Sequence, residues 1–440
     1  MEKKKQELTT QPYRGTRDFF PPEMQKLRYL FGVWRTVAEK FGYEEYLGPF
    51  LEAWELYAAK NVSGEEIVNE QLYWFEDRGG RKVALRPEMT PTVARMIAQR
   101  YQQLPKPIRW FSIANFMRYE RPQKGRVREF FQLNLDIFGE PGVAADAEAI
   151  EAAVAIMKEF GASENMFEIR INNRKLVDHL LNSKFEIRNS KLEQVMRVID
   201  RMAKQSNHQT IQQLEDLGLS PSQVKSVLSL SELDLADVDQ IKDSSDGARE
   251  VVDLFDLLAE RGIDRFVKFD AALMRGLDYY TGNVFEQFDL NPNNNRSMFG
   301  GGRYDGLADL FGVKDVAAVG FAPGDVTTLE FLENWNLLPE FDAAAEVLVT
   351  VFNQDLRQNS WQIAQALRES GIKTELYLKN DDSITTQLNY ADRKSIPNVI
   401  VVGPGEVDTE TVVLKNLTTG EQKTLPLVEA TESLRAASPR

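Results

Sequence analysis

The stretch that decides the fold is residues 108–138, IRWFSIANFMRYERPQKGRVREFFQLNLDIF. Two strand-like runs, 108–119 and 129–138, flank the polar loop ERPQKGRVR, a pattern that predicts two neighbouring strands. In the second run, apolar and polar residues alternate and therefore fall on opposite faces. The apolar set is Phe131, Leu133, Leu135 and Ile137, and the polar set is Gln132, Asn134 and Asp136. One apolar and one polar face are typical of an antiparallel sheet, and the polar face is a candidate pocket floor.

The loop between these strands is rich in cations. It carries Arg121, Lys124, Arg126 and Arg128, with Arg118 at its entry. A charged loop is as often a solvated turn, but Phe130 follows as a stacking surface for a purine. The arginine fork matches phosphate oxygens and stays charged in a desolvated pocket. No GxxxxGK[ST] motif occurs, so the composition indicates a nucleotide site without a P-loop.

The segments before this stretch predict an amphipathic helix, a strand and a second helix. Apolar residues from Pro22 to Phe41 recur at three- and four-residue spacing, with Gly42 as a stop. ALRPEM (84–89) reads as a strand. Thr90 is then expected as an N-cap, with a proline in the first turn, for a helix to about Gln103.

The segments after it predict that a helical insertion interrupts the domain. Residues 173–262 hold helical periodicities such as LEQVMRVIDRM and VVDLFDLLAERG and read as a helical insertion domain. Strands and glycines resume in 263–337, so 1–172 and 263–337 are expected to form one split domain. From 345 to 440, strands such as EVLVTVF and NVIVVG alternate with helices such as SWQIAQALRES, which predicts a small α/β domain with a largely parallel sheet.

Two further clusters stand out in the resumed part. MRGLDYYTG contains Arg275, Asp278, Tyr279 and Tyr280; it fits an edge strand with packed tyrosines, but Arg275 beside a glycine suggests close approach to a ligand. GGGRYDGL, from Gly300, is expected to be a tight turn before a helix. Its three glycines suit either close ligand approach or a flexible hairpin.

Composition narrows the function classes. The 440 residues are 42% apolar and 27% charged, typical of a soluble globular chain of two or three domains. No run approaches about 18 apolar residues, and the polar start MEKKKQELTTQ lacks the apolar core of a secretory signal, so no membrane span and a cytoplasmic location are expected. The net charge of −14 argues against indiscriminate nucleic-acid coating.

Residue usage also limits the chemistry. The absence of cysteine excludes disulfides, thiolate zinc sites and a cysteine nucleophile. The two histidines, His179 and His208, fall in helical, polar stretches where surface positions are expected. Chemistry that relies on an imidazole base is therefore not expected.

The motifs LRPEMTPTVAR, RYERPQKGRVREFFQLNLDIFG, RGLDYYTGNVFE and GGRYDGL together resemble the histidyl-tRNA synthetases, a class II aminoacyl-tRNA synthetase family. RGTRDF near the start and the C-terminal α/β segment fit as well. The resemblance implies an α+β fold: an antiparallel-sheet catalytic domain with a helical insertion, and an anticodon-binding domain at 345–440. It implies a homodimer that uses ATP to form histidyl-adenylate from L-histidine and then charges tRNA(His).

The resemblance also implies roles for individual residues. Arg118 and Arg275 are expected to grip the α-phosphate and act as the catalytic pair, each also touching histidine. Phe130, Glu120 and Arg126 are expected to line the ATP site, and Mg²⁺ to bridge the outer phosphates. Gln123 and Arg128 match positions that approach the tRNA acceptor end. The residues expected to hold the amino group and imidazole of histidine are Glu88, Thr90, Gln132, Asp136, Tyr279 and Tyr280.

This sequence departs from the family pattern at one phosphate position. GFAPGDVTTLEFL carries Thr327 where the family's third motif has an arginine for the γ-phosphate. Arg126, another basic residue or magnesium is expected to compensate. The alternative function is a synthetase-like regulatory subunit of ATP phosphoribosyltransferase. Such relatives generally lack the C-terminal domain and RGLDYYTG, both of which are present here.

Overall fold

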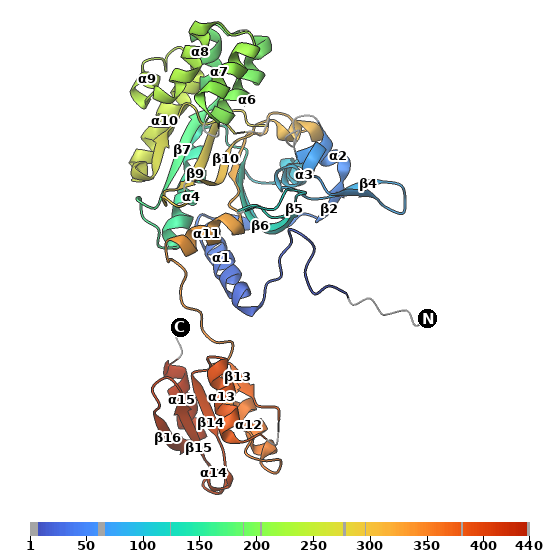
Figure 1. The fold of residues 1–440 in the computed structure, drawn as a ribbon, viewed down its shortest axis with the longest axis vertical. Helices are drawn as coiled ribbons and strands as arrows, with labels where there is room; N and C mark the ends of the chain where they lie inside the picture. The colour runs from blue at the N-terminus through green and yellow to red at the C-terminus, as the bar shows by residue number, and fades with distance from the viewer. Residues whose placement is uncertain are drawn as a thin grey trace. The chain divides into compact units, whose positions relative to one another are not determined.

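The computed structural model describes residues 8–59, 67–123, 125–187, 189–202, 205–275, 279–294, 296–379 and 382–437. The chain divides into two compact units, Met1–Leu338 and Pro339–Arg440 (Figure 1). Among the described residues, no helix is both long and apolar enough to cross a membrane.

The first unit is built on an eight-stranded sheet with the order β1-β5-β6-β11-β10-β9-β7-β8. The six central strands, from β5 to β7 in this order, are antiparallel to one another. The short edge strands pair in parallel, β1 with β5 and β8 with β7. In chain order the strands are β1 (Glu44–Glu45), β5 (Ile108–Met117), β6 (Glu129–Phe138), β7 (Phe167–Asn173), β8 (Val267–Phe269), β9 (Asn283–Asp289), β10 (Ser297–Arg303) and β11 (Ala318–Phe321). The predicted antiparallel, α+β architecture is confirmed.

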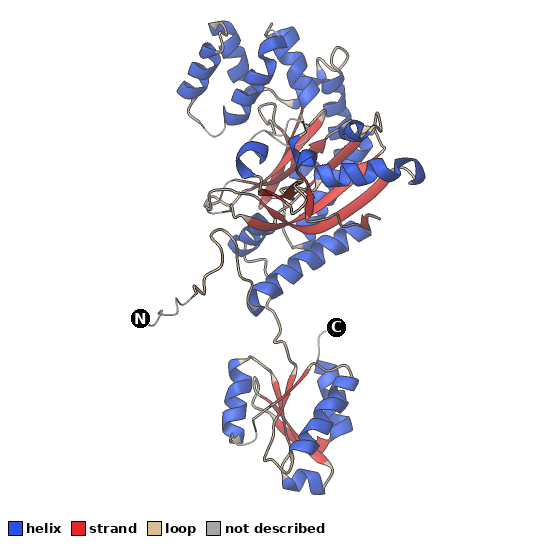
Figure 2. Cartoon of the chain, turned by 90° about the vertical axis from the view of Figure 1, so that its right-hand side faces the viewer, coloured by secondary structure: helices blue, strands red, loops and turns tan. Residues whose placement is uncertain are grey.

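Helices cover one face of this sheet, as Figure 2 shows, and the side chains on that face are apolar. They are α1 (Pro21–Lys40), α4 (Val143–Glu159), α10 (Asp246–Glu260) and α11 (Asp325–Asn334). α1 presents Leu27, Leu30 and Trp34 to the core, and the chain leaves it at Gly42, whose φ is +77°. Leu133, Leu135 and Ile137 of β6 enter the same core, so the predicted alternation of β6 is confirmed.

A smaller three-stranded sheet, in the order β2-β4-β3, precedes β5. It consists of β2 (Leu51–Ala53), β3 (Trp74–Glu76) and β4 (Lys82–Leu85), with α2 (Trp54–Ala58) and the π-helix Ile67–Gln71 nearby in sequence. The prediction that 84–89 forms a strand is wrong beyond Leu85. Arg86 leaves the sheet because its buried guanidinium donates to the carbonyl oxygens of Asn115 and Gly48, each at 2.8 Å.

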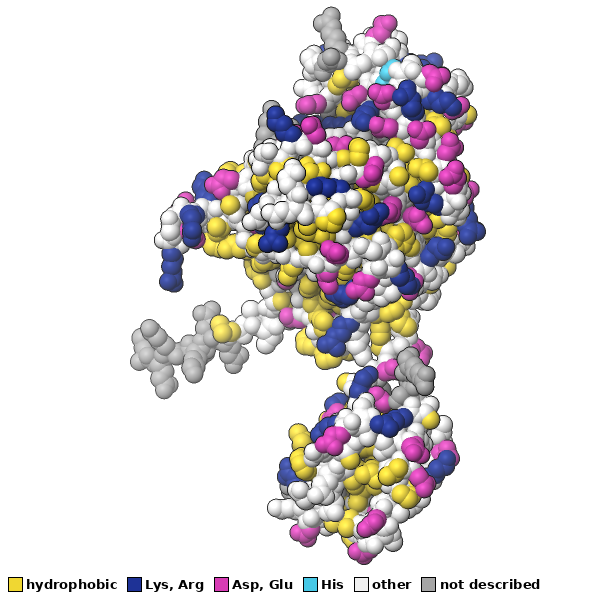
Figure 3. Space-filling view, turned by 180° about the vertical axis from the view of Figure 1, so that it is seen from behind, with side chains coloured by type: hydrophobic (Ala, Val, Ile, Leu, Met, Phe, Trp, Pro, Cys, Tyr) yellow, Lys and Arg dark blue, Asp and Glu magenta, His cyan; other side chains and the backbone are white. Residues whose placement is uncertain are grey.

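Residues 174–260 are helical, as expected, and pack around a core of their own. The helices are α5 (Arg174–His179), α6 (Leu192–Met202), α7 (Asn207–Asp216), α8 (Pro221–Leu228), α9 (Leu235–Asp239) and α10. α10 also packs on α4, which ties this segment to the sheet within the first unit. On the face drawn in Figure 3, basic and acidic side chains are interspersed over this segment.

The second unit alternates strands and helices as predicted, but its sheet is mixed rather than largely parallel. Its sheet has the order β13-β12-β14-β15-β16, with parallel pairing among the first three strands and antiparallel pairing beyond. The strands are β12 (Val347–Val349), β13 (Thr374–Leu376), β14 (Asn398–Val401), β15 (Thr411–Asn416) and β16 (Gln422–Pro426). The helices are α12 (Arg357–Glu369), α13 (Ile384–Arg393), α14 (Pro404–Asp408) and α15 (Leu427–Ala437).

Candidate active site

The polar face of β6 forms one wall of a cavity of about 770 Å³. Gln132, Asn134 and Asp136 line it, because side chains two residues apart on a strand point the same way. The pairing of Gln132 with Gly324 and of Asp136 with Gly320 brings β11 and the start of α11 beside them. The strand pattern thus delivers three hydrogen-bonding side chains to one concave surface.

Asp136 is a buried acid of this wall, with 5% of its surface exposed. Burial raises the pKa of Asp136 to about 7, although the bond donated by the Tyr304 hydroxyl lowers it. Gly320 makes room for this carboxylate, since a Cβ there would lie 2.1 Å from Asp136 Oδ1. Asp136 therefore changes charge near neutral pH, inside the cavity.

A second acidic group comes from the segment before α3 (Thr90–Arg100). Glu88 is buried, and its Oε2 accepts a hydrogen bond from the Tyr279 hydroxyl at 3.3 Å. Burial and the nearby Glu88 carboxylate raise the pKa of Tyr279 well above its ordinary value, so this hydroxyl remains a donor. The rings of Tyr279 and Tyr280 pack at 5.0 Å, and both line the cavity.

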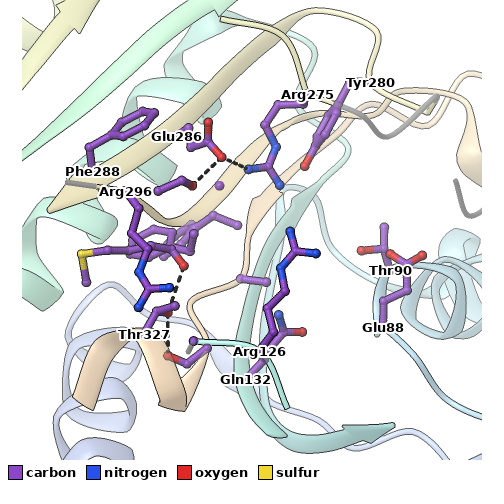
Figure 4. A pocket seen from close by; sticks show the side chains of 18 of the residues that line it. Glu88, Thr90, Arg126, Gln132, Arg275, Tyr280, Glu286, Phe288, Arg296 and Thr327 are labelled. Atoms are coloured by element: carbon purple, nitrogen blue, oxygen red, sulfur yellow. Dashed lines mark hydrogen bonds and ion pairs between the residues drawn. The ribbon is translucent and has the colours of Figure 1, made fainter. Parts of the chain in front are cut away.

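Thr90 also lines the cavity, but not as the predicted N-cap. The helix begins at Thr90 itself, and Met89 takes the cap position without a side-chain hydrogen bond. The first-turn proline is confirmed. Because Thr90 is the first residue of the helix, the direction of its side chain is set by the helical backbone. Figure 4 shows this side chain beside Glu88.

Arg275 reaches the cavity from the segment after β8. Its Nη1 lies 3.1 Å from Glu286 Oε1 of β9, and its guanidinium lies 6.0 Å from the Tyr280 ring centroid (Figure 4). Burial alone lowers the pKa of Arg275, but the coulombic attraction of Tyr280 and Glu286 outweighs it and raises that pKa. The arginine is therefore a fixed cation. Residues 276–278, including Gly276 and Asp278 of the quoted motif, lie outside the described residues.

Gly300 explains how the cavity accommodates Arg275. The predicted turn at 300–302 is wrong, because these glycines belong to β10 and the turn comes afterwards. A Cβ at Gly300 would lie 1.8 Å from Arg275 Nη1, and one at Gly301 would lie 2.5 Å from the Phe285 ring. The glycines thus permit close approach, as one reading of the motif expected, and at Gly300 the approaching group is a side chain of this chain.

Arg118 stands at the end of β5. Its Nε donates to the carbonyl oxygen of Pro87 at 2.9 Å, and its guanidinium lies 5.3 Å from the Phe130 ring centroid. Phe116 stacks beside Phe130 at 5.8 Å. Glu120 lies 3.9 Å from Arg118, measured between Oε1 and Nη1. Arg118, Glu120 and Phe130 all line the cavity.

The loop after β5 closes on itself at Gln123 and Arg126, whose backbone groups exchange two hydrogen bonds of 3.0 and 2.9 Å. Gly125 provides the positive φ, +74°, that this turn needs. Both Gln123 and Arg126 line the cavity, and the Arg126 side chain is 59% exposed. Lys124 lies outside the described residues.

Arg128 is the predicted site residue that does not line the cavity. It is 8% exposed; its Nη1 donates to the Tyr13 hydroxyl at 2.7 Å, and its guanidinium lies 4.1 Å from the Tyr119 ring centroid. Its backbone N–H donates to the Gly15 carbonyl oxygen at 2.7 Å. Arg128 therefore fastens the N-terminal segment to the loop.

Thr327 lies in the first turn of α11, at the far side of the cavity from Glu88 and Thr90 (Figure 4). Its hydroxyl donates to the Met298 carbonyl oxygen at 3.0 Å. Arg296, immediately before β10, lines the same wall and forms an ion pair with Glu330 of α11. The cation at this wall comes from a strand end that the sequence did not single out.

Several polar lining residues were given no role from the sequence, among them Asn134, Glu286, Arg296 and Tyr304. Asn134 shares the polar face of β6, and its Nδ2 has no hydrogen-bond partner within the described part of the chain. Glu286 and Tyr304 stand inside the quoted motifs, where the motif itself was the available signal. Arg296 follows an asparagine-rich loop, and no periodicity marks it.

Comparison with known proteins gives a consistent result. A family model described as histidyl-tRNA synthetase matches residues 15–326, and one described as an anticodon binding domain matches residues 346–437. The histidine–tRNA ligase of Leptospira biflexa is 38% identical over 436 residues, covering 98% of this chain and 99% of that protein. The histidine–tRNA ligase of Haloarcula marismortui is 39% identical over 420 residues, covering 94% and 95%.

The fold has solved counterparts as well. The crystal structure of histidyl-tRNA synthetase from Nostoc sp. PCC 7120 superposes with a TM-score of 0.82 at 23% identity, covering 98% of this chain and all of that one. At 23% identity, this structural similarity supports the fold alone.

Proposed function

The chain belongs to the histidyl-tRNA synthetase family and is an aminoacyl-tRNA ligase, and we propose that the cavity over β6 is where it joins histidine to AMP. ATP, histidine and tRNA are its substrates. The regulatory alternative is not supported, because the full-length relatives are ligases and residues 346–437 match an anticodon-binding domain.

One observation carries the proposal for the site: two arginines and two buried acids from distant parts of the chain line a single cavity. Arg118 and Arg275 are the arginines, and Glu88 and Asp136 are the acids. An amino acid offers a positive amino group at one end and an anionic carboxylate beside it. The acids suit the amino group and the imidazole N–H, and the arginines suit the carboxylate together with the phosphate it attacks.

The chemistry then follows from charge. A carboxylate oxygen of histidine attacks the α-phosphorus of ATP, the bond from that phosphorus to the bridging oxygen breaks, and pyrophosphate leaves with the electron pair. No protein base is needed, since the nucleophile is already an anion at pH 7. Charge on the equatorial oxygens is stabilised by fixed cations, and we assign this task to Arg118 and Arg275.

The remaining roles are proposed from position in the cavity. Tyr279 and Tyr280 form an aromatic wall for the imidazole, next to Gln132 and Thr90. Phe130 offers a surface for adenine, with Glu120 near its amino group and Arg126 toward the phosphates. Gln123, on the exposed turn, remains the proposed contact for the acceptor end of tRNA.

Magnesium enters this proposal as part of the nucleotide substrate. Among the described residues, no group of three or more His, Cys, Asp or Glu side chains could hold a metal ion. Glu286 and Glu120, which line the cavity, each lie beside an arginine. These residues do not form a site for a resident ion.

We also propose that the chain works as a homodimer. The three-stranded sheet carries large apolar side chains that are about half exposed, namely Leu51 (42%), Trp74 (51%) and Phe75 (47%). Leu51 and Phe75 lie opposite Leu85 and Val83 of β4 and therefore share one face of the sheet, and exposed apolar side chains on one face favour association with a second protein surface. Sedimentation equilibrium of the full chain would test this, and a monomer at micromolar concentration would contradict it.

The function is tested by amino-acid-dependent exchange of labelled pyrophosphate into ATP. Each proteinogenic amino acid is supplied separately, with a reaction lacking amino acid as the control. Exchange with histidine alone is expected. Exchange with a different amino acid would contradict the assignment of the cavity.

A further inference from the structure

Two of the arginines that line the cavity have no role in the proposed reaction. Among the described lining residues, the arginines are Arg118, Arg126, Arg170, Arg275 and Arg296. Arg170 is engaged by Glu168 at 2.7 Å and by Asp270 at 3.6 Å, and its guanidinium lies 4.3 Å from the Phe288 ring centroid. Arg296 has no place in the reaction so far.

Arg296 is held firmly at its wall. Its Nη2 forms an ion pair with Oε2 of Glu330, whose side chain is 15% exposed, and α11 carries this glutamate. The turn of the 123–126 loop lies directly on the guanidinium, since a Cβ at Gly125 would be 2.5 Å from Arg296 Nη1. An arginine anchored by a carboxylate keeps its fork in one orientation, at a reduced entropy cost for binding an anion.

The first turn of α11 brings no cation of its own to this wall. Thr327 is neutral and donates to a backbone carbonyl oxygen. Asp325 is fully buried and accepts from the backbone N–H of Phe131 at 2.9 Å and from Arg17 at 2.7 Å. The N-terminus of α11 therefore already has an anion beside it, and a phosphate at this wall needs Arg296.

The positions of the charged side chains in the cavity indicate which phosphates of ATP lie next to Arg296. In Figure 4, Glu88 and Thr90 lie on one side of Arg126 and Arg275, and Arg296 and Thr327 lie on the other. Histidine occupies the acidic side, and its carboxylate meets the α-phosphate between the arginines. The β- and γ-phosphates then extend away from the amino acid, toward the wall of Arg296.

We infer that Arg296, oriented by Glu330, binds the β- and γ-phosphates of ATP and stabilises the departing pyrophosphate. The inference rests on the proposed function of the cavity and adds a phosphate-binding residue to it. It also accounts for the neutral side chain at Thr327, because the neighbouring strand end supplies the charge from a different position in the sequence.

The test compares nucleotides that differ only in these phosphates. Calorimetry on the full-length chain measures Kd for ATP and for AMP in wild type and in Arg296→Ala. The variant is expected to raise Kd for ATP by about 10- to 100-fold, the range for a lost charge-assisted hydrogen bond, and to leave Kd for AMP unchanged. Arg261→Ala, which removes an arginine paired with Glu151 at 3.1 Å outside the cavity, is the matched control.

A second variant controls for the effect of breaking the ion pair between Arg296 and Glu330. Arg296→Ala removes a partner of Glu330, so Arg296→Gln with Glu330→Gln replaces the charges by amides of similar shape, and thermal unfolding verifies both proteins. An unchanged Kd for ATP in a folded variant would overturn the inference, as would an equal loss of ATP and AMP. Binding needs no amino acid, so failure of histidine-dependent exchange would count against the proposed function alone.

Discussion

The guanidinium of Arg275 occupies the space that any side chain at position 300 would fill, because a Cβ on Gly300 would lie 1.8 Å from Arg275 Nη1. The two residues are distant in sequence and meet only because β10 passes beside the segment after β8. The glycine and the arginine therefore act as one unit, and substituting either is expected to damage the same step.

Gly300→Ala should displace Arg275 from its bond to Glu286 and slow pyrophosphate exchange by about 10²-fold, the cost of an approximately 1 Å misplacement of a catalytic group. The stability cost should stay within about 1–3 kcal/mol, as for other overpacked sites. Gly32→Ala is the control, since Gly32 is exposed in α1 and a Cβ there would meet nothing within 4 Å. Full exchange activity in Gly300→Ala would mean that Arg275 does not need its observed position.

Arg275→Ala should reduce histidine-dependent pyrophosphate exchange by about 10²- to 10³-fold or more, because a fixed positive charge is lost where negative charge develops. The fall is expected mainly in kcat, with a smaller change in KM for ATP. Arg261→Ala should keep the wild-type rate. A variant at 275 with normal exchange and normal folding would remove this arginine from catalysis.

Asp136→Ala should raise KM for histidine steeply, by about 10²- to 10⁴-fold, since a site built to hydrogen-bond a polar group loses its discrimination when the partner is removed. Steady-state exchange at varied histidine concentration measures the effect. KM for ATP should change far less, because the nucleotide is proposed to lie at the other side of the cavity. Equal changes in both constants would contradict the assignment of Asp136 to the imidazole.

Asp136 should also make stability depend on pH. Folding raises its pKa from the ordinary 3.8 to about 7, so folding favours the protonated carboxyl. Its stabilising contribution is complete below about pH 4 and is lost as the pH rises to about 7, at a cost of about 2–4 kcal/mol at most. Asp136→Asn cannot ionise and should lack this loss. Chemical denaturation of both proteins at pH 5 and pH 8 tests it, and parallel stability curves would contradict it.

Arg128 and Arg126 should behave differently despite their shared loop. Arg128→Ala is expected to lower Tm, because it removes the contacts with Tyr13 and Tyr119, and to change KM for tRNA little. Arg126→Ala should leave Tm unchanged, since its side chain is 59% exposed, and should raise KM for ATP. Differential scanning calorimetry and aminoacylation kinetics separate the two. A raised KM for tRNA with unchanged Tm in Arg128→Ala would restore the acceptor-end role expected from the sequence.

Local periodicity determined a large part of this protein. Three features were predictable: the helix α1, the alternation along β6 and the strand–helix alternation after residue 345. Apolar residues at a period of 3.6 mark the buried face of a helix, and those at a period of 2 mark the buried face of a strand. The same alternation placed Gln132, Asn134 and Asp136 together on one face. The family motifs identified Glu88, Arg118, Arg275 and the two tyrosines as candidate site residues.

What only the tertiary structure decided concerns contacts between distant segments. The strand predicted at 84–89 stops at Leu85 because Arg86 bonds to carbonyl groups of other segments, and the glycines at 300–302 form a strand because Arg275 and Phe285 approach them. Arg128 turned toward Tyr13, whereas Arg296 gained its place from Glu330, 34 residues later. Sequence patterns report on the nearest neighbours along the chain. The position of a charge in a cavity depends on partners that only folding brings within hydrogen-bonding distance.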